Sequence, residues 1–235
     1  MRSAPADTPS PADILVIADI HLGRGQHGEK KVGPGLDWAL AALEAGARQG
    51  CGHLVVLGDV IDKKRYTAAT YGEVARLFDR ALELFSRVLF ISGNHDTAHD
   101  LSGVIPAGVT VAGPVPATYS AGGWAVHTAA VEVDRDPREL AGTFPAAEEG
   151  RPNLGALHTS LTGEWTNPCL PADPAELLSL GYDAWVLAHV HRRMTVNADP
   201  FMGYVGMGHA LRASARAGTV TVSPAAVPVW ERPEG

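Results

Sequence analysis

The sequence predicts an α/β fold with two β-sheets, the first largely parallel and the second more mixed. Up to residue 91, three short apolar segments alternate with two segments of helical periodicity, an order typical of a parallel sheet. After residue 109 the apolar segments are short and bounded by Gly and Pro, which favours a more mixed sheet. A chain of 235 residues is long enough for one such domain.

The first part of the chain is expected to alternate strands with helices. The apolar runs at 14–18, 53–57 and 88–91 are predicted strands. Between them, leucines at 36, 40 and 43 share one face of a predicted helix over 36–49, and a second helix is predicted over 71–86.

The second part contains shorter elements. Asp173 as a cap and Pro174 in the first turn indicate a helix over 174–180. Residues 1–12, rich in Pro, Ala and Ser, are expected to be a disordered tail, 13–225 the single domain and 226–235 a C-terminal tail. The predicted strands are 109–111, 124–127, 154–157, 184–188, 194–196 and 219–222.

Charge and composition limit the function. Lys and Arg number 19 against 26 Asp and Glu, so a net charge of −7 repels polyanions, and any nucleic-acid contact must rest on metal ions or local basic patches. Cys51 and Cys169 are far apart and indicate neither a disulfide framework nor a structural zinc site. The N-terminus lacks an apolar signal region and no run approaches about 20 apolar residues, so we expect a soluble cytoplasmic protein without membrane contact.

Polar side chains follow five of the predicted strands, at the point where each strand ends. In a parallel sheet these ends lie along one edge, where α/β proteins place their ligand sites, so the polar clusters are expected to converge. Glycines 58 and 93 beside them allow close backbone approach. The polar residues at these ends are Asp19, His21, Asp59, Asp62, Asn94, His95, Asp96, His158, His189 and His191.

Carboxylate, amide and imidazole groups, with no thiolate, suit borderline-hard divalent ions such as Mn²⁺, Fe²⁺ or Zn²⁺. Seven candidate ligands are too many for one ion, whereas two ions that share a bridging carboxylate would use them all. The seven are Asp19, His21, Asp59, Asn94, His158, His189 and His191.

The motifs at the strand ends resemble a known family. The calcineurin-like metallophosphoesterases carry D-x-H, G-D-x-x-D, G-N-H-D or G-N-H-E, a lone His, and G-H-x-H in that order; this chain has DIH, GDVID, GNHD, His158 and AHVH. The one departure is Ala188 in place of Gly, at a position that is not a ligand. The resemblance implies a four-layer α-β-β-α sandwich of two mixed sheets flanked by helices.

The resemblance also implies the roles of the site residues. Two divalent ions, Mn²⁺ being the most expected, would share Asp59, and a hydroxide that bridges them would attack phosphorus. His95 would be the general acid, oriented by Asp62. Asp96 has three open roles: support of His95, support of His158, or a cap on the following loop. The implied ligands are Asp19, His21, Asp59 and His191 for one ion and Asp59, Asn94, His158 and His189 for the other.

The substrate is less well defined than the chemistry. The HLG that follows D-x-H and the stretch 153–193 are similar to SbcD-type and YhaO-type DNA repair nucleases, so an exonuclease or endonuclease of this type is the first expectation. A phosphodiesterase or phosphatase for nucleotides or other small phosphoesters is the second. A noncatalytic scaffold is the third, and the presence of His95 with every ligand argues against it.

Several further residues are candidates for substrate contact. Basic clusters at 63–65 and 192–193 could guide a phosphate backbone, or could be solvated loops. The acidic balance predicts weak autonomous binding of DNA, so an SMC-type ATPase partner or a homodimer would supply further surface. His53 is expected in the core, whereas His127 could pack or line the site. The substrate-binding candidates are His27, His99, Arg192 and Arg212.

Overall fold

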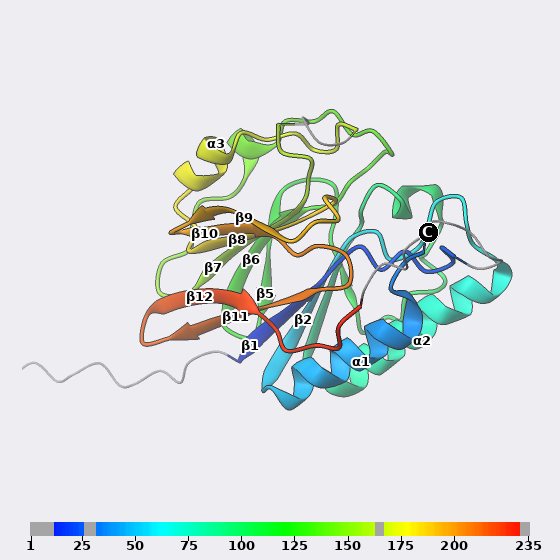
Figure 1. The fold of residues 1–235 in the computed structure, drawn as a ribbon. Coiled ribbons are helices and arrows are strands. Elements are labelled where there is room, and N and C mark those ends of the chain that lie inside the picture. The colour runs from blue at the N-terminus through cyan, green and yellow to red at the C-terminus, as the bar shows by residue number, and fades with distance from the viewer. Residues whose placement is uncertain (1–11, 26–31, 163–166, 231–235) are drawn as a thin grey trace, which may run out of the picture.

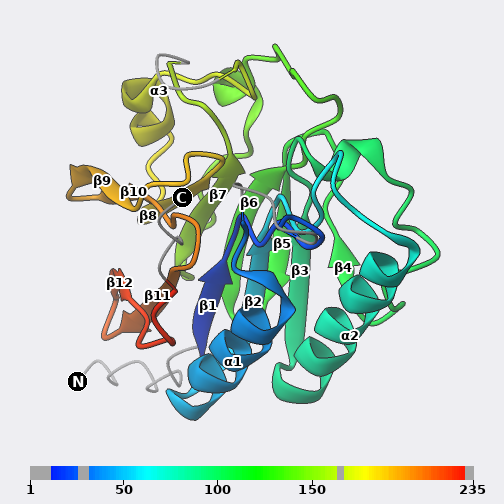
Figure 2. The same ribbon diagram turned by 45° about the vertical axis from the view of Figure 1, so that its right-hand side comes forward.

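The computed structural model describes residues 12–25, 32–162 and 167–230. Two six-stranded sheets pack face to face (Figure 1). The helices α1 (Gly35–Arg48) and α2 (Ala68–Leu84) cover the outer face of the first sheet, and the short α3 (Pro174–Ser179) lies on the outer side of the second (Figure 2). The predicted four-layer α/β fold with two mixed sheets is confirmed.

The first sheet combines a parallel and an antiparallel part. Its order is β12-β11-β1-β2-β3-β4, in which β1 to β4 run parallel, β11 pairs antiparallel with β1, and β12 pairs antiparallel with β11. The bounds are β1 (Asp13–Ile17), β2 (Cys51–Leu57), β3 (Arg87–Ile91), β4 (Thr110–Val111), β11 (Ala210–Arg216) and β12 (Thr219–Pro224).

The second sheet has the order β5-β6-β7-β8-β10-β9, with four parallel strands between antiparallel edges. The expectation that the strand at 109–111 belongs to this sheet is wrong, because β4 pairs with β3 in the first sheet. The predicted strand at 219–222 also lies in the first sheet, where β12 pairs with β11. The bounds are β5 (Ala117–Ala121), β6 (Trp124–Ala129), β7 (Asn153–His158), β8 (Ala184–Ala188), β9 (Met194–Ala198) and β10 (Phe201–Tyr204).

The apolar core lies in three layers that follow from strand alternation. Along β1, Ile14 and Val16 point between the two sheets, while Leu15 and Ile17 point toward α1 and α2. A third cluster, which includes Trp185, fills the space between the second sheet and α3. Because β1 is buried on both of its faces, the polar residues next to it in the chain can reach a site outside the core only at the ends of the strand.

The helix ends follow local sequence signals. Asp173 caps α3 as predicted, since its Oδ1 accepts the Ala175 N–H at 2.7 Å. Helix α2 begins before the predicted residue 71, because the Thr67 N–H donates to Thr70 Oγ1 at 2.9 Å and closes an earlier first turn.

The segment after β12 packs along α1. The indole Nε1 of Trp38 donates to the Pro228 carbonyl at 3.0 Å, and Trp230 packs against the core beneath α1. The predicted C-terminal tail is therefore held in place over 226–230, and residues 1–11 of the predicted N-terminal tail lie outside the described residues. Within the described ranges, the model contains no helix long and apolar enough to cross a membrane.

Candidate metal centre

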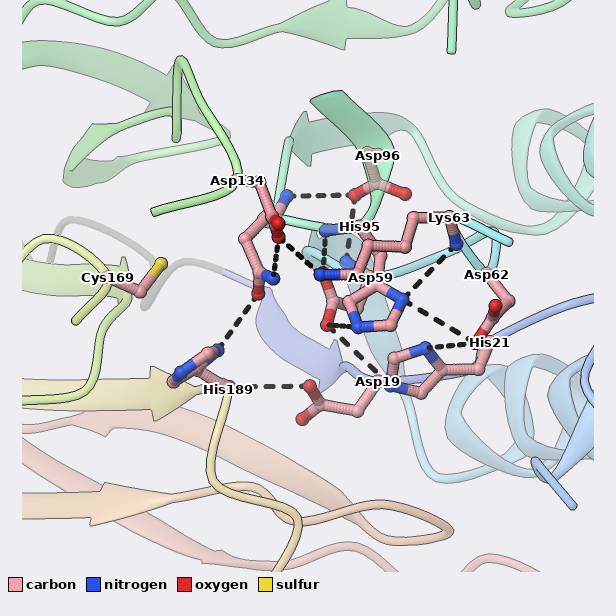
Figure 3. Close-up of polar contacts among 12 residues, drawn as sticks. Asp19, His21, Asp59, Asp62, Lys63, His95, Asp96, Asp134, Cys169 and His189 are labelled. Atoms are coloured by element: carbon pink, nitrogen blue, oxygen red, sulfur yellow. Dashed lines mark hydrogen bonds and ion pairs between the residues drawn. The ribbon is translucent and has the colours of Figure 1, made fainter. Parts of the chain in front are cut away.

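The seven predicted ligands meet at one edge of the two sheets. They come from the loops after β1, β2 and β3 and from the ends of β7 and β8, and the residues that Figure 3 labels among them point toward one another. The two sheets touch here, since His158 Nδ1 lies 3.2 Å from the Leu57 carbonyl oxygen. The structure therefore brings together residues that are up to 172 positions apart, from 19 to 191.

The first group of ligands consists of Asp19, His21, Asp59 and His191, whose ligand atoms all lie within 4.8 Å of one another. His21 Nε2 lies 3.0 Å from His191 Nε2 and 3.6 Å from Asp59 Oδ2. The second carboxylate oxygen of Asp19 is buried and has no hydrogen-bond partner among the residues that the structure describes. A buried orphan oxygen beside two imidazole nitrogens fits a divalent cation.

The second group surrounds Asn94. Its Oδ1 lies 3.0 Å from His189 Nδ1 and 3.3 Å from His158 Nε2. His158 Nε2 is also 3.5 Å from Asp59 Oδ1, whereas Asp59 Oδ2 faces the first group. Asp59 thus directs one oxygen to each group, which is the geometry of a bridging carboxylate.

Neighbouring carbonyl groups fix the tautomers of two histidines. His158 Nδ1 donates to Leu57 O, and His189 Nε2 lies 3.3 Å from Asn167 O. The other nitrogen of each ring then carries a lone pair that faces Asn94 Oδ1, where a metal ion could bind. Burial, followed by neighbouring positive charge, lowers the pKa of His189 to about 4 and that of His191 to about 3, so both rings are neutral at pH 7, as metal ligands must be.

Charge balance in the buried site also favours cations. Burial and then the charge of Asp59 raise the pKa of Asp19 well above its usual value. Two buried carboxylates that face each other remain ionised together only with positive charge between them. Divalent ions supply that charge, and the residues present fit two of them.

Backbone conformation at the ligands is unusual. Asp19, His21 and Asp59 have φ angles of 53°, 50° and 53°, and His189 has 90°. Non-glycine residues rarely adopt positive φ, and such strain clusters at functional sites. Asp19 N donates to Gly58 O at 3.0 Å and His21 N to Asp59 O at 2.9 Å, so contacts between the two loops hold this conformation.

Two glycines permit the close approach of the ligand loops. A Cβ at Gly93 would lie 2.4 Å from Asp59 Oδ1, and one at Gly58 would lie 2.3 Å from His158 Nδ1. Any side chain at either position would displace a ligand.

His95 and Asp62 lie beside the first group. His95 Nδ1 accepts the Lys63 N–H at 3.2 Å and is 3.5 Å from Asp62 Oδ2. The neutral ring therefore carries its proton on Nε2, which lies 4.0 Å from Asp59 Oδ2. Asp62 is held in turn by Arg24, whose Nε donates to its Oδ2 at 2.6 Å.

Asp96 has none of its predicted supporting roles toward His95 or His158. Its carboxylate accepts backbone N–H groups from Asp59, Val60, Ile61 and Gly93 at 2.8 to 3.1 Å. It therefore fixes the loop after β2 against the loop after β3.

Two other groups of possible ligands lie nearby. His21, Asp62 and His95 form one, but the Arg24 guanidinium on Asp62 already supplies positive charge there. Cys169 lies with His158 and His189, and burial raises the pKa of its thiol, so it is not a thiolate at neutral pH.

The predicted substrate residues have different positions. Arg192 is exposed directly after His191, at the rim of the centre. Both ring nitrogens of His99 are engaged, with Tyr71 Oη at 3.0 Å and Asp62 O at 3.1 Å, so His99 braces a loop. His27 lies outside the described residues.

The fourth candidate, Arg212, does not reach the site. Its Nε donates to Asp13 Oδ2 at 2.6 Å, at the beginning of β1, whereas the ligands follow the end of that strand. This position does not agree with a substrate contact, because the ion pair holds the guanidinium at the opposite edge of the sheet.

His53 lies in the core as expected, and His127, whose role the sequence left open, packs in the core as well. His53 is buried and its Nδ1 is 3.1 Å from Ser86 Oγ. His127 is also buried, with Thr118 Oγ1 and Asn153 Oδ1 each 2.9 Å from its ring nitrogens, and it stacks on Tyr182. Neither residue lies in the candidate centre.

Sequence reasoning missed two residues beside the centre. Arg24 contacts Asp62, and Asp134 accepts from the side chain of Asn94 at 3.0 Å. Both lie in segments without strand or helix periodicity. The sequence held no signal for Asp134, whereas Arg24 directly follows HLG.

The fold and the site together define a metal-dependent phosphoesterase. The sequence profile of the calcineurin-like phosphoesterases matches residues 12–193, and the chain belongs to this family. The uncharacterized metallophosphoesterase YhaO of Bacillus subtilis strain 168 is 23% identical over 179 residues, which are 70% of this chain and 43% of that protein. The chain thus spans less than half of this relative's length.

Two solved structures share the fold. A dimetal phosphatase from Danio rerio has a TM-score of 0.53 at 11% identity, covering 92% of this chain and 96% of that one. The TT1561 protein of Thermus thermophilus has a TM-score of 0.52 at 11% identity, covering 92% and 99%. At such low identity the likeness extends to the fold alone.

Proposed function

We propose that this phosphoesterase cleaves phosphodiester bonds in DNA as a repair-type nuclease, with His95 as the proton donor. The observation that carries the proposal is the position of His95. Its ring contacts His21 edge to face, with centroids 4.6 Å apart, yet 16% of its side chain reaches solvent. A leaving group that enters from solvent would meet Nε2. The imidazolium form of His95 would donate its Nε2 proton to that group and return to the neutral ring, and Asp62 Oδ2, 3.5 Å from Nδ1, would stabilise the charged form.

Two divalent ions held by these residues would supply Lewis acidity to the phosphoryl oxygens and would lower the pKa of water toward about 7. We propose Mn²⁺ as the native metal, with Fe²⁺ or Zn²⁺ as alternatives, since the ligand groups suit all three. Asp59 fixes the position of the two sites relative to each other. Asp62 and the backbone N–H of Lys63 fix the plane of the His95 ring.

Exposed cations near the centre support a polyanionic substrate. Arg192 and Arg193 are exposed after His191, and Lys64 is exposed two residues after Asp62. With a net charge of −7, these side chains would steer a phosphate backbone only locally, so we propose that a second copy or an SMC-type ATPase supplies the remaining DNA contacts. The two buried free thiols, Cys51 and Cys169, are consistent with a cytoplasmic protein.

The second candidate function is hydrolysis of a small phosphoester. A pocket of about 390 Å³ is lined by Lys63, Lys64 and Asp134 among others. Two of these lining residues make hydrogen bonds to the site, Lys63 to His95 and Asp134 to Asn94. This volume suits a small ligand. Lys63 Nζ is paired with Asp134 at 2.6 Å, which reduces the positive charge offered to a long polyanion.

The test is to incubate the purified protein with Mn²⁺ and labelled single-stranded and duplex DNA, alongside bis-nitrophenyl phosphate and a phosphomonoester. Cleavage of DNA by the wild type and not by His95→Ala is expected. Intact DNA with hydrolysis of the small diester would select the second candidate. Equal activity of His95→Ala on every substrate would remove His95 from the proposed mechanism.

A further inference from the structure

The side chain of Asn94 can serve a metal ion in only one of its two orientations. An amide oxygen is a ligand, whereas the amide nitrogen carries two hydrogens and repels a cation. Asn94 is 6% exposed, and its Oδ1 faces His189 Nδ1 and His158 Nε2 at 3.0 and 3.3 Å. Some other group must hold the amide in this orientation.

Asp134 is that group. Its Oδ1 accepts from Asn94 Nδ2 at 3.0 Å, so the amide nitrogen points away from the second ligand group. Rotation of the amide by half a turn would place its oxygen against the Asp134 carboxylate, which is unfavourable, and would turn its hydrogens toward the two imidazole nitrogens, where they would take the place of a metal ion. The contact with Asp134 therefore selects the orientation in which Asn94 can bind a metal.

Lys63 braces Asp134 and also contacts His95. Its Nζ donates to the same Oδ1 of Asp134 at 2.6 Å, and its backbone N–H donates to His95 Nδ1 at 3.2 Å. A continuous set of contacts therefore joins a ligand of the second group, through Asp134 and Lys63, to the residue placed as proton donor (Figure 3).

We propose that Asp134 is a positioning residue for the second metal ion, which it stabilises by fixing the amide of Asn94, and that Lys63 holds Asp134 in place. The inference goes beyond the choice between DNA and small substrates, because it concerns the loading of one of two metal sites. Residues that orient a metal ligand typically change metal affinity about 10- to 100-fold when they are removed.

A simpler account treats Lys63 and Asp134 as a surface ion pair. The Asp134 side chain is 49% exposed, and exposed pairs contribute little to stability. That account predicts no effect on metal binding. The hydrogen bond to the buried Asn94 distinguishes the two accounts, since it connects the exposed carboxylate to the second ligand group.

The test is a Mn²⁺ titration of metal-free protein by calorimetry, with electron paramagnetic resonance to separate coupled ion pairs from single ions. The wild type is expected to bind two ions and to show a coupled signal. Asp134→Ala should retain the first ion at unchanged affinity, bind the second about 10- to 100-fold more weakly and give a single-ion signal at low metal. Asp134→Asn, which keeps an acceptor oxygen, should recover part of the loss.

Two further comparisons keep the proposal falsifiable. In an Asn94→Ala background, Asp134→Ala should have no additional effect on the second ion, because the group that it positions is gone. Asp100→Ala, whose carboxylate contacts only Ser102 among the described residues, should behave as the wild type. Unchanged second-ion affinity in Asp134→Ala, equal weakening of both ions, or an undiminished effect in the Asn94→Ala background would each overturn the proposal.

Discussion

The carboxylate of Asp96 accepts the backbone N–H of Asp59 at 2.8 Å. It also accepts three more backbone N–H groups, so one buried side chain fixes the loop that carries the bridging ligand. Because Asp96→Ala would leave these donors buried without partners, we expect a loss of about 3 to 5 kcal/mol in the free energy of unfolding. Urea denaturation measures the loss, with Asp173→Ala, an exposed helix cap, expected to lose only about 1 kcal/mol. Equal losses in the two variants would contradict this role.

Gly93 is expected to tolerate no side chain. In Gly93→Ala the new Cβ would lie 2.4 Å from Asp59 Oδ1, so either the carboxylate or the backbone must shift. We expect weaker binding of both ions and a corresponding loss of activity, because Asp59 serves both ligand groups. Metal content after dialysis measures the effect. Gly103→Ala, which meets no atom within 4 Å, is the matched control, and wild-type metal content in Gly93→Ala would refute the prediction.

Removal of the proton donor should depend on the leaving group. His95→Gln is expected to lower kcat by about 10²- to 10⁴-fold for a diester with an alkoxide leaving group. The loss should be much smaller for a nitrophenyl diester, because nitrophenolate leaves without a proton. Metal content should stay at the wild-type level, since His95 belongs to neither of the two assigned ligand groups. The same fold-loss for both substrates would mean that His95 acts in another way.

The buried His127 should make stability depend on pH. Burial lowers the pKa of His127, so the unfolded chain binds this proton more tightly than the folded chain. The free energy of unfolding of metal-free protein should therefore fall as the pH drops below about 6.5, the usual value of an unfolded His, until the folded ring is protonated. His127→Gln should reduce the slope in this range by up to about 1.4 kcal/mol per pH unit. Urea denaturation from pH 7.5 to 5 checks this, and an unchanged slope would count against it.

The convergence of the candidate ligands could be predicted from the sequence because each of them follows a buried strand. Strand β1 must leave the core at its end, and the next polar residues, Asp19 and His21, appear at the sheet edge. Asp134 could not be predicted in this way. It lies between β6 and β7 in a long connection whose path depends on tertiary contacts, and its partners Asn94 and Lys63 are distant in sequence.

Strand pairing was predicted less well than strand position. The short segment at 110–111 reads as a strand in either sheet, and only its pairing with Leu89 and Phe90 places it in the first. Strand β11 was not predicted, because its small and polar residues, as in Ala213 and Ser214, give a weak apolar signal. Local periodicity detects an apolar face but does not identify the neighbour that covers it.

The position of β11 beside β1 has a practical consequence for the design of truncated or fused versions of this protein. The family profile ends at residue 193. Strand β11, which pairs with Ile14 to Ile17 of β1, begins only at Ala210, beyond that limit. A fragment that stopped at 193 would leave the central strand β1 with an open, apolar edge able to pair with other chains. The shortest expressible unit therefore has to reach at least Pro224, the last residue of β12, even though every candidate metal ligand precedes residue 193.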